Sequence, residues 1–504
     1  MEGEEKHMLY NSTRSNTTEV SSAQAITQGI SKEGGLFVPE QLPALSADIL
    51  ASLTDKTYVE RAKYILSLFL TDFDEAEIAY CAENAYTTEK FKTDHIAELS
   101  HLFEGNYMLE LWHGPTCAFK DMALQILPYL LTTSAKKVAK DKKIVILVAT
   151  SGDTGKAALE GFKDVPGTQM LVFYPEDGVS AMQKRQMTTQ EGENVAVCAI
   201  KGNFDDAQTG VKKIFTDPAV VAKLADNNMM FSSANSINWG RLLPQIVYYV
   251  STYCELVKDG EITMGEALNV VVPTGNFGNI LAAYYAKKMG VPLGKLICAS
   301  NANNVLTEFI QTGTYNKIRD FHTTISPSMD ILISSNLERL LYDLSGCDDQ
   351  KITAWFKQLS ETGQYTVDAD VKAKLDAEFY AGCCDDVQTK ETIKRIFDRY
   401  SYVCDTHTAV AVKVAEDYKK ATGDTTKTVI VSTASPYKFA NSVLDAITGE
   451  VPADDYAQVD ALCELSKLEI PSALADLKEK PVRFTGSIEK ADMEQAVMDM
   501  LKLN

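Results

Sequence analysis

Short apolar segments recur along this chain, each followed by a turn rich in small residues and then by a helical stretch. Four of them are IVILVAT (144–150), MLVFYP (170–175), NVVVPT (269–274) and TVIVST (428–433). Continuous apolar runs are typical of buried strands, and strands that alternate with helices predict a mostly parallel α/β sheet. Because ligands bind beyond the carboxyl ends of such strands, the four turns are candidate site loops.

Other parts of the chain have a different residue pattern. Residues 1–95 predict a mainly helical N-terminal domain, with TYVERAKYILSLFL (57–70) at helical spacing. The charged, turn-broken stretch 349–400 predicts a peripheral insertion. A length of 504 residues suffices for about two or three domains.

Charge and cysteine usage exclude several classes of function. The net charge of −20 argues against binding to nucleic acid or anionic lipid, which both need clustered Lys and Arg. The ten cysteines show no C-x-x-C pair, the six histidines show no metal-ligand spacing, and no apolar run is long enough to span a membrane. We find no secretory or transit signal and expect a cytoplasmic protein.

The segment MLELWHGPTCAFKDMALQILPYLL (108–131) contains a candidate nucleophile. A strand-like LELW leads through a turn to Lys120, which opens an apolar-faced helix. Desolvation and the positive end of the helix would lower the pKa of this lysine and favour the neutral amine that attacks an aldehyde. The alternative is a lysine that extends to water from an ordinary first turn.

The segment VVVPTGNFGNILAAYYAKK (270–288) contains a candidate anion site. Gly275, Asn276, Phe277, Gly278 and Asn279 lie between a buried strand and a helix, where backbone N–H groups can converge on a phosphate. The spacing matches neither a Walker motif nor G-x-G-x-x-G. The alternative is a glycine-rich turn needed only for tight packing of the strand against the helix.

Two further strand ends offer small polar residues. In ATSGDTGKAALEGF (149–162), Ser151, Gly152, Asp153, Thr154 and Gly155 suit a carboxylate, although Asp153 and Thr154 equally suit a helix N-cap. In VIVSTASPYKFANSVL (429–444), Thr433 can meet a heteroaromatic nitrogen or cap the helix. A helix-start lysine, a phosphate turn, an anion loop and a strand-end hydroxyl on one sheet suit a cofactor with an aldehyde and a phosphate, namely pyridoxal 5'-phosphate (PLP).

The order of these motifs and the residues in them resemble the threonine synthase family, in its longer bacterial and fungal type. The matching segments are HGPTCAFKD, ATSGDTG, SSANSINWGRLLPQ, PTGNFGNILAAYYAK, SPSMDI-LISSNLERLLY and STASPYKF, together with the N-terminal SSAQAITQGISKEGGLFVPEQLP. The similarity covers most of the chain and is weakest in 345–400 and at both ends.

The resemblance implies a role for each matching position. Lys120 would form the Schiff base with PLP, the turn Gly275–Asn279 would hold the cofactor phosphate, and Thr433 would meet the pyridine nitrogen. The loop Ser151–Gly155 would bind the substrate's α-carboxylate. Asn238 and Arg241 would bind the substrate phosphate, for which the planar fork of an arginine is suited.

Two positions depart from the pattern of the family. Ser435 stands where the family commonly has histidine, and Pro244 stands where a small helix residue is usual. These departures concern the fit of the substrate and the rate more than the binding of the cofactor.

The fold implied by the resemblance is α/β of the tryptophan-synthase-β-like type (PLP fold type II), with two parallel-sheet lobes that have helices on both faces. Residues 96–135 and 240–460 would form the larger PLP-binding domain, 136–239 a smaller mobile domain with the SGDTG loop, and 461–504 a helical C-terminal tail. The chain would be a monomer or a homodimer.

The activity implied is that of a PLP-dependent carbon-oxygen lyase, which converts O-phospho-L-homoserine and water to L-threonine and phosphate. A phospho-lyase or a threonine/serine dehydratase of the same fold is the alternative enzyme. A metabolite-binding protein without activity is the alternative from a different class, and retention of Lys120 argues against it.

Overall fold

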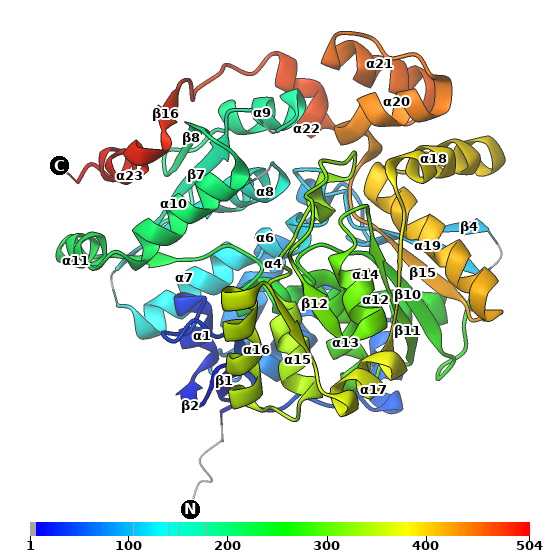
Figure 1. Cartoon of the computed structure of the whole chain (residues 1–504), viewed down its shortest axis with the longest axis horizontal. Helices are drawn as coiled ribbons and strands as arrows, with labels where there is room; N and C mark the ends of the chain where they lie inside the picture. The colour runs from blue at the N-terminus through cyan, green and yellow to red at the C-terminus, as the bar shows by residue number, and fades with distance from the viewer. Residues whose placement is uncertain (1–6, 104, 141, 151, 178, 504) are drawn as a thin grey trace, which may run out of the picture.

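The computed structural model describes residues 7–103, 105–140, 142–150, 152–177 and 179–503, and its strands form two main sheets (Figure 1). A six-stranded sheet has the order β14-β11-β10-β15-β5-β4, and a five-stranded sheet has the order β16-β8-β7-β6-β9. All the pairings in both sheets are parallel except that of β4 with β5. This confirms the predicted α/β architecture with two parallel sheets.

The larger sheet is buried on both faces. Its strands are β4 (Glu98–Phe103), β5 (Asn106–Glu110), β10 (Leu268–Pro273), β11 (Leu293–Ser300), β14 (Phe379–Cys383) and β15 (Thr428–Ser432). Val270 and Val272 pack into one core and Val271 into the other, as the period of two in a strand requires. This two-sided burial explains why these strands are continuous apolar runs in the sequence.

Helices cover both faces of this sheet. One core contains residues of α12 (Trp239–Lys258), α13 (Gly278–Met289), α14 (Val305–Thr312) and α15 (Leu337–Leu344). The other contains residues of α18 (Asp386–Tyr400), α19 (Thr406–Thr422), α20 (Ala440–Thr448) and α21 (Asp455–Ser466). α6 (Asp121–Leu124) and α7 (Leu127–Val138) follow β5.

The smaller sheet is built in the same way. Its strands are β6 (Lys143–Ala149), β7 (Thr168–Pro175), β8 (Val195–Lys201), β9 (Met229–Ser232) and β16 (Ser487–Glu489). Its helices are α8 (Asp153–Phe162), α9 (Ala181–Thr188), α10 (Phe204–Thr216), α11 (Pro218–Asp226) and α23 (Met493–Leu501). Ile144 and Ile146 face the core that includes α8, whereas Val145 and Leu147 face α10, α11 and α23.

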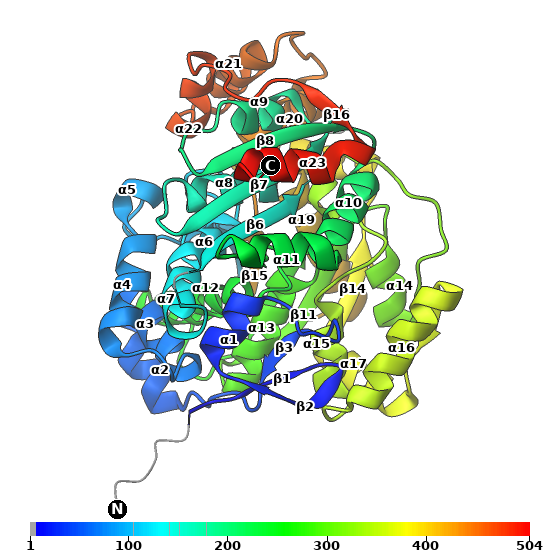
Figure 2. The ribbon, with the colours of Figure 1, turned by 90° about the vertical axis from the view of Figure 1, so that its left-hand side faces the viewer.

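The N-terminal region is mainly helical, with a small antiparallel sheet. It comprises β1 (Tyr10–Ser12), β2 (Ser15–Val20), α1 (Ser22–Gln28), β3 (Phe37–Pro39), α2 (Ala47–Leu53), α3 (Tyr58–Phe69), α4 (Glu75–Ala85) and α5 (Thr88–Phe91). The helix expected in 57–70 is α3, which begins at a capping box of Thr57 and Glu60. Figure 2 shows α2, α3 and α4 near α7 and below the smaller sheet.

Two segments take part in the sheets more than we predicted. The stretch 349–400, expected to be a peripheral insertion, contains β14, which pairs with β11 in the larger sheet. Only α16 (Asp349–Thr362), β13 (Gln364–Thr366), which pairs with β12 (Thr314–Asn316), and α17 (Ala369–Glu378) precede it. The short apolar run FYAGC is inconspicuous between charged helices, which explains the error.

The C-terminal segment, expected to be a helical tail, contributes β16 to the edge of the smaller sheet. In Figure 1 this strand and α23 lie beside β8 and α10. In the sequence, α22 (Ser472–Ala475) lies between α21 and β16. The C-terminal end of the chain therefore completes the smaller sheet, and the domain boundaries given above remain predictions.

The two sheets meet closely at α6 and α8. A Cβ atom at Gly161 of α8 would lie 2.0 Å from the carbonyl oxygen of Leu124 in α6. No side chain can be accommodated at such a contact, so the glycine sets the spacing between the helix that follows β6 and the helix that begins after Lys120.

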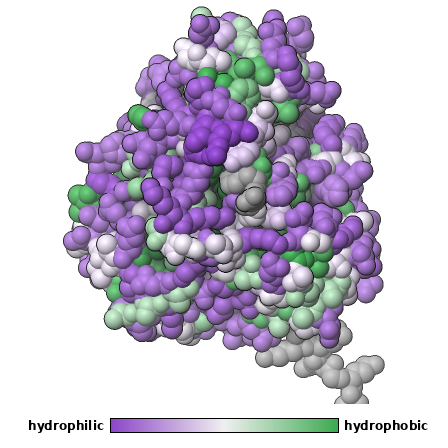
Figure 3. All heavy atoms as spheres, turned by 90° about the vertical axis from the view of Figure 1, so that its right-hand side faces the viewer, coloured by the Kyte–Doolittle hydropathy of each residue, from purple (hydrophilic) through white to green (hydrophobic). Residues whose placement is uncertain are grey.

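One face of the molecule is predominantly hydrophilic. On the face shown in Figure 3, hydrophobic residues form small separate patches among hydrophilic ones. Among the described residues, none of the helices combines the length and the hydropathy that crossing a membrane requires.

Candidate active site

Three neighbouring strands of the larger sheet end at the predicted cofactor-binding segments. The strands β5, β15 and β10 are adjacent and parallel, so their carboxyl ends lie at the same edge of the sheet. Lys120 follows β5, Thr433 follows β15, and the turn Gly275–Asn279 follows β10. The topology thus brings these segments to one edge, with Thr433 on the middle strand.

The turn before Lys120 is held by the fully buried side chain of Asp121. Thr116 donates two hydrogen bonds of 2.7 Å to this carboxylate, from its backbone N–H to Oδ2 and from its hydroxyl to Oδ1. Gly114 packs directly against it, because a Cβ atom there would lie 2.6 Å from the Cβ of Asp121. Burial raises the pKa of Asp121 to about 6, although the hydrogen bonds from Thr116 act in the opposite direction.

The amine of Lys120 has a ring contact but no hydrogen-bond or ion-pair partner in the described part of the chain. The side chain is partly buried, its Nζ lies 5.3 Å from the ring centroid of Phe119, and it forms no hydrogen bond or ion pair with the residues that the structure describes. Burial lowers the pKa of Lys120 to about 8. The carboxylate of Asp153 raises it, and the positive charges of Arg241 and Lys438 lower it. More of this amine is therefore uncharged at neutral pH than in an exposed lysine.

The turn Gly275–Asn279 has its carbonyl groups occupied by the protein. The carbonyl oxygen of Gly275 accepts a hydrogen bond of 2.7 Å from the hydroxyl of Ser334. That of Asn276 accepts two bonds of 3.1 Å from the backbone and side-chain N–H groups of Asn336. The first N–H groups of α13 have no partners within the helix and are suited to an anion at its N-terminus.

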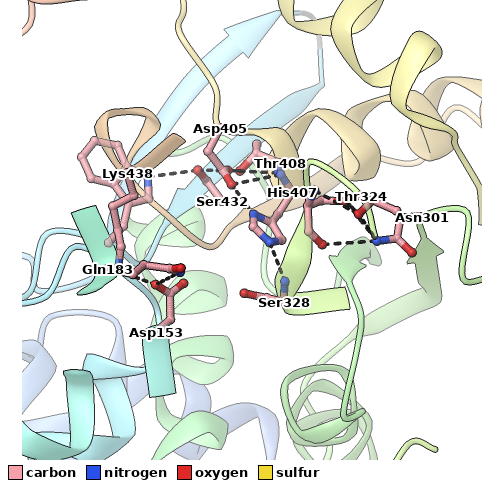
Figure 4. Close-up of polar contacts among 12 residues, drawn as sticks. Asp153, Gln183, Asn301, Thr324, Ser328, Asp405, His407, Thr408, Ser432 and Lys438 are labelled. Carbon is pink, nitrogen blue, oxygen red and sulfur yellow. Dashed lines mark hydrogen bonds and ion pairs between the residues drawn. The ribbon is translucent and has the colours of Figure 1, made fainter. Parts of the chain in front are cut away.

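The segment 326–336, which supports this turn, is itself anchored by a buried pair, His407 and Asp405 (Figure 4). The N–H of Ser328 donates to Nε2 of His407 at 3.1 Å, and Nδ1 of His407 lies 2.7 Å from Oδ2 of Asp405. Because Nε2 accepts, the proton lies on Nδ1 and is donated to the carboxylate. A Cβ atom at Gly275 would lie 2.5 Å from the carbonyl oxygen of Ser328, which explains the glycine.

Two hydroxyl groups at the end of β15 have no partner among the described residues. The carbonyl of Thr433 accepts a bond of 2.8 Å from the N–H of Phe119, and the N–H of Ser435 donates to the carbonyl of Cys117 at 3.0 Å. The hydroxyl of Ser435 is fully buried and unpaired. Thr433 is almost fully buried, and its hydroxyl makes no hydrogen bond to the described part of the chain. Buried polar groups without partners are expected beside a ligand site.

In the loop that follows β6, some backbone N–H groups already donate to a side chain of the loop itself. The hydroxyl of Thr150 accepts bonds from the N–H groups of Gly152, at 3.0 Å, and Gly155, at 2.9 Å. These two N–H groups are therefore not available to a substrate carboxylate. Thr154 is partly exposed, and Ser151 lies outside the described residues.

Asp153, predicted to bind the substrate, is instead paired with Lys438 across the two sheets (Figure 4). Nζ of Lys438 lies 2.6 Å from Oδ1 of Asp153, and the side chains are 0% and 4% exposed. Gln183 donates to the same oxygen at 3.1 Å, and Lys438 also donates to the carbonyl of Thr116 at 3.0 Å. Burial alone would raise the pKa of Asp153, but the charges of Lys438 and Lys120 hold it well below its usual value.

Asn238 and Arg241 differ in what they offer to a ligand. Asn238 caps α12 by accepting from the N–H of Gly240 at 2.8 Å, and its Nδ2 donates to the carbonyls of Ile26 and Ser233. Both polar atoms of this amide are hydrogen-bonded within the protein, so no donor of Asn238 is free for a substrate phosphate, contrary to the prediction. Arg241 donates to one carbonyl, that of Ala234, and has no carboxylate partner among the described residues.

The charge of Arg241 is therefore not neutralised locally. Burial lowers its pKa to about 10, so the guanidinium is still a cation at neutral pH. Its positive charge also lowers the pKa of Lys120. A buried cation that acts on the candidate nucleophile and has no carboxylate partner among the described residues is suited to an anionic ligand.

Sequence reasoning had missed Lys438, Gln183 and the pair of His407 and Asp405. Lys438 lies in the motif STASPYKF, and Ser328 lies in SPSMDI, which carried the family resemblance but no assigned role. The roles of these residues depend on contacts between distant segments. Asp153 and Lys438, for example, are 285 residues apart in the sequence. Such contacts have no local sequence signal.

The residues present fit PLP. Lys120 offers an amine of lowered pKa, the N-terminus of α13 offers donors to a phosphate, and Nδ2 of Asn279 is buried without an acceptor. A hydroxyl, that of Thr433, rather than a carboxylate follows the middle strand. The donor set therefore contains what an aldehyde, a phosphate and an unprotonated ring nitrogen need.

Comparison with protein families gives matches along most of the chain. Residues 9–86 match the threonine synthase N terminus, residues 96–373 match the pyridoxal-phosphate dependent enzymes, and residues 408–498 match the threonine synthase C-terminal family.

Individual relatives extend over nearly the whole chain. "Threonine synthase-like 1" of Macaca fascicularis is 40% identical over 490 residues, which cover 95% of this chain and 64% of that protein. The chain therefore spans less than two thirds of the length of that relative. The threonine synthase of Pseudomonas aeruginosa is 36% identical over 95% of both chains. The crystal structure of PLP-bound threonine synthase from Brucella melitensis is 34% identical, with a TM-score of 0.87 over 98% of this chain and 99% of that chain.

The lowered pKa of Lys120 predicts how the uptake of PLP depends on pH. Only the uncharged amine reacts with an aldehyde, so the rate of PLP uptake should rise with pH and reach half its maximum at about pH 8. Stopped-flow absorbance of the apoprotein mixed with PLP measures this midpoint. A midpoint at about pH 10.4, the pKa of an exposed lysine, would contradict a buried environment for this amine.

The buried pair of Asp153 and Lys438 predicts a non-additive effect on stability. Lys438→Met leaves a buried carboxylate without its partner and should cost about 3–5 kcal/mol, whereas adding Asp153→Asn should restore much of the loss. Thermal unfolding of the single and double variants measures the effect. Lys357→Met, which removes the exposed pair with Glu361, is the matched control and should change stability by less than about 0.5 kcal/mol. Equal effects of the two Lys→Met substitutions would refute this role of Lys438.

Proposed function

This chain belongs to the threonine synthase family of PLP-dependent enzymes, and from that premise we propose that it converts O-phospho-L-homoserine and water to L-threonine and phosphate. It would thus act as a carbon-oxygen lyase on a phosphate ester. The relatives of about the same length are named threonine synthases, which supports the proposal.

The observation that carries the proposal is the charge arrangement around Lys120. Arg241 is a buried cation without a carboxylate partner, close enough to Lys120 to lower its pKa. A substrate with an amine at one end and a phosphate at the other would place the amine at Lys120 and the phosphate at Arg241. A dehydratase acting on threonine or serine would have no use for this cation.

When bound, PLP supplies an aldehyde that forms an imine with an amine and an electron sink for negative charge at the α-carbon. Lys120 would hold the cofactor at rest. Once the substrate amine has replaced it, Nζ of Lys120 would remove the proton from Cα and then shuttle the proton at Cβ. Phosphate would leave from Cγ, the protons taken from Cα and Cβ would return to Cα and Cγ, and water would add its hydroxide at Cβ and supply the proton that the released phosphate takes up.

The surrounding residues would orient the reactants. The N–H groups of the turn Gly275–Asn279 would bind the cofactor phosphate, and the hydroxyl of Thr433 would meet the ring nitrogen without protonating it. Arg241 would bind the leaving phosphate and stabilise its charge. In the loop Ser151–Gly155, Thr154 and the N–H groups not used by Thr150 would bind the substrate's carboxylate.

Asp153 would contribute indirectly to the binding of that carboxylate. Its own negative charge would repel a substrate carboxylate, and the ion pair with Lys438 neutralises it. Because the pair joins the smaller sheet to the larger one, it would also hold the loop over the substrate. We propose that residues 136–239 form the smaller domain that carries this loop.

The decisive experiment identifies the product. The protein is incubated with PLP and O-phospho-L-homoserine, and phosphate and the amino-acid product are measured in the same sample. We expect one threonine for each phosphate released. Release of 2-oxobutyrate in place of threonine would show a phospho-lyase instead, and no phosphate release would refute both. Lys120→Ala should abolish phosphate release and the visible absorbance of lysine-bound PLP.

Arg241→Lys tests the role of the guanidinium. This change keeps the positive charge but removes the planar fork, so KM for O-phospho-L-homoserine should rise about 10- to 100-fold. Binding of PLP, measured by absorbance, should be unchanged. If KM stays the same, the substrate phosphate does not bind at Arg241.

A further inference from the structure

Two tyrosines of α12 converge on the last residue of the turn Gly275–Asn279. The hydroxyl of Tyr248 donates to Oδ1 of Asn279 at 2.9 Å, and the hydroxyl of Tyr249 donates to the same oxygen. Tyr248 is 0% and Tyr249 1% exposed, and Asn279 is 7% exposed. These hydroxyls lie deep in the protein behind the turn.

The amide of Asn279 is satisfied on one side only. Its oxygen has two donors, whereas its Nδ2 is buried and has no acceptor among the described residues. A buried donor without an acceptor is unfavourable and rare, so such a group requires an explanation. An acceptor that is part of a bound ligand would provide one.

Neighbouring groups bear on the orientation of this amide. Gln245 donates from Nε2 to the carbonyl of Arg241 at 3.0 Å, and its Oε1 lies 3.1 Å from the hydroxyl of Tyr248, so Gln245 and Asn279 share the single proton of that hydroxyl, whereas Tyr249 donates to Asn279. Because the carbonyl of Arg241 can only accept, the amide of Gln245 cannot be reversed. Burial raises the pKa of both Tyr248 and Tyr249 well above the usual value, so both remain hydroxyl donors.

A reversed Asn279 would be unfavourable in a phosphate site. It would turn its Nδ2 towards the tyrosines and its oxygen towards the start of α13, where an anion is expected. Two lone-pair acceptors, the amide oxygen and a phosphate oxygen, would then face each other. The tyrosine hydroxyls favour the orientation that avoids this repulsion.

We propose that Tyr248 and Tyr249 are positioning residues that hold the amide of Asn279 with Nδ2 directed at the phosphate of PLP. This inference rests on the proposed function in one respect, that the turn Gly275–Asn279 holds that phosphate. Tyr248 shares its proton with Oε1 of Gln245, and Nε2 of Gln245 donates to the carbonyl of Arg241. One helix, α12, thereby sets both the donor to the cofactor phosphate and the cation for the substrate phosphate.

The test compares PLP with pyridoxal, which has the aldehyde but no phosphate. Dissociation constants for both are measured by equilibrium dialysis against the full-length apoprotein. The double variant Tyr248→Phe/Tyr249→Phe should bind PLP about 5- to 20-fold more weakly and pyridoxal as before, since a charge-assisted hydrogen bond is lost. Asn279→Ala should have the same effect, and the triple variant should show no further loss.

Tyr253→Phe is the matched control. Tyr253 lies on the same helix, but its hydroxyl donates to the carbonyl of Glu266 at 3.1 Å, away from the turn. Its removal should leave binding of both PLP and pyridoxal unchanged. Asn279→Asp provides a second route, because the tyrosine bonds are retained while an oxygen replaces Nδ2. This variant should bind PLP more weakly than Asn279→Ala.

Three results would overturn the inference. They are unchanged PLP binding by the double tyrosine variant, equal loss of PLP and pyridoxal binding, and additive losses in the triple variant. If the unaltered protein binds PLP no better than pyridoxal, the phosphate assignment of the turn fails instead. Since these measurements use binding alone, they are independent of whether threonine is the product.

Discussion

The pairing of β15 between β5 and β10 is the constraint on which the site depends. Its backbone hydrogen bonds fix Ser432 opposite Glu110 and Ile430 opposite Val271. Because adjacent parallel strands lie about 4.8 Å apart and end together, the turns that follow them have little freedom relative to each other. This pairing therefore sets the relative positions of the segments that contain Lys120, Thr433 and the turn Gly275–Asn279. A change in register on β15 would separate the amine from the hydroxyl and from the phosphate turn.

Electrostatics add what the backbone cannot provide. The chain has a net charge of −20, yet the surroundings of Lys120 include the cations Arg241 and Lys438. Lys438 is neutralised by Asp153, whereas Arg241 has no carboxylate partner in the described part of the chain, so its positive charge remains available to an anionic ligand. Placing that charge in a buried position strengthens its attraction for a phosphate, since water screens it less. The acidic exterior and the cationic interior are therefore compatible, because they act over different distances.

The success of prediction differed between the elements of this protein. The strand in 269–274 and the turn after it were predictable, because an apolar run and closely spaced glycines are local signals. β14 was missed because its short apolar run lies among charged helices. The assignment of Asn238 failed for another reason. A side chain at a helix start can bind a ligand or cap the helix, and the contact with Ile26 that decides this lies 212 residues away.

The sequence alone determined the parallel α/β class and the PLP-dependent family, and it predicted Lys120 as the candidate lysine, because each of the contributing motifs is a local pattern of residue types. The tertiary structure decided which polar groups have partners. Asp153 pairs with Lys438 and Asn279 with Tyr248 and Tyr249, whereas Arg241 is left with an uncompensated charge. These outcomes depend on which distant segments meet at the ends of the strands. Only folding brings those segments within hydrogen-bonding distance, so no local pattern can specify them.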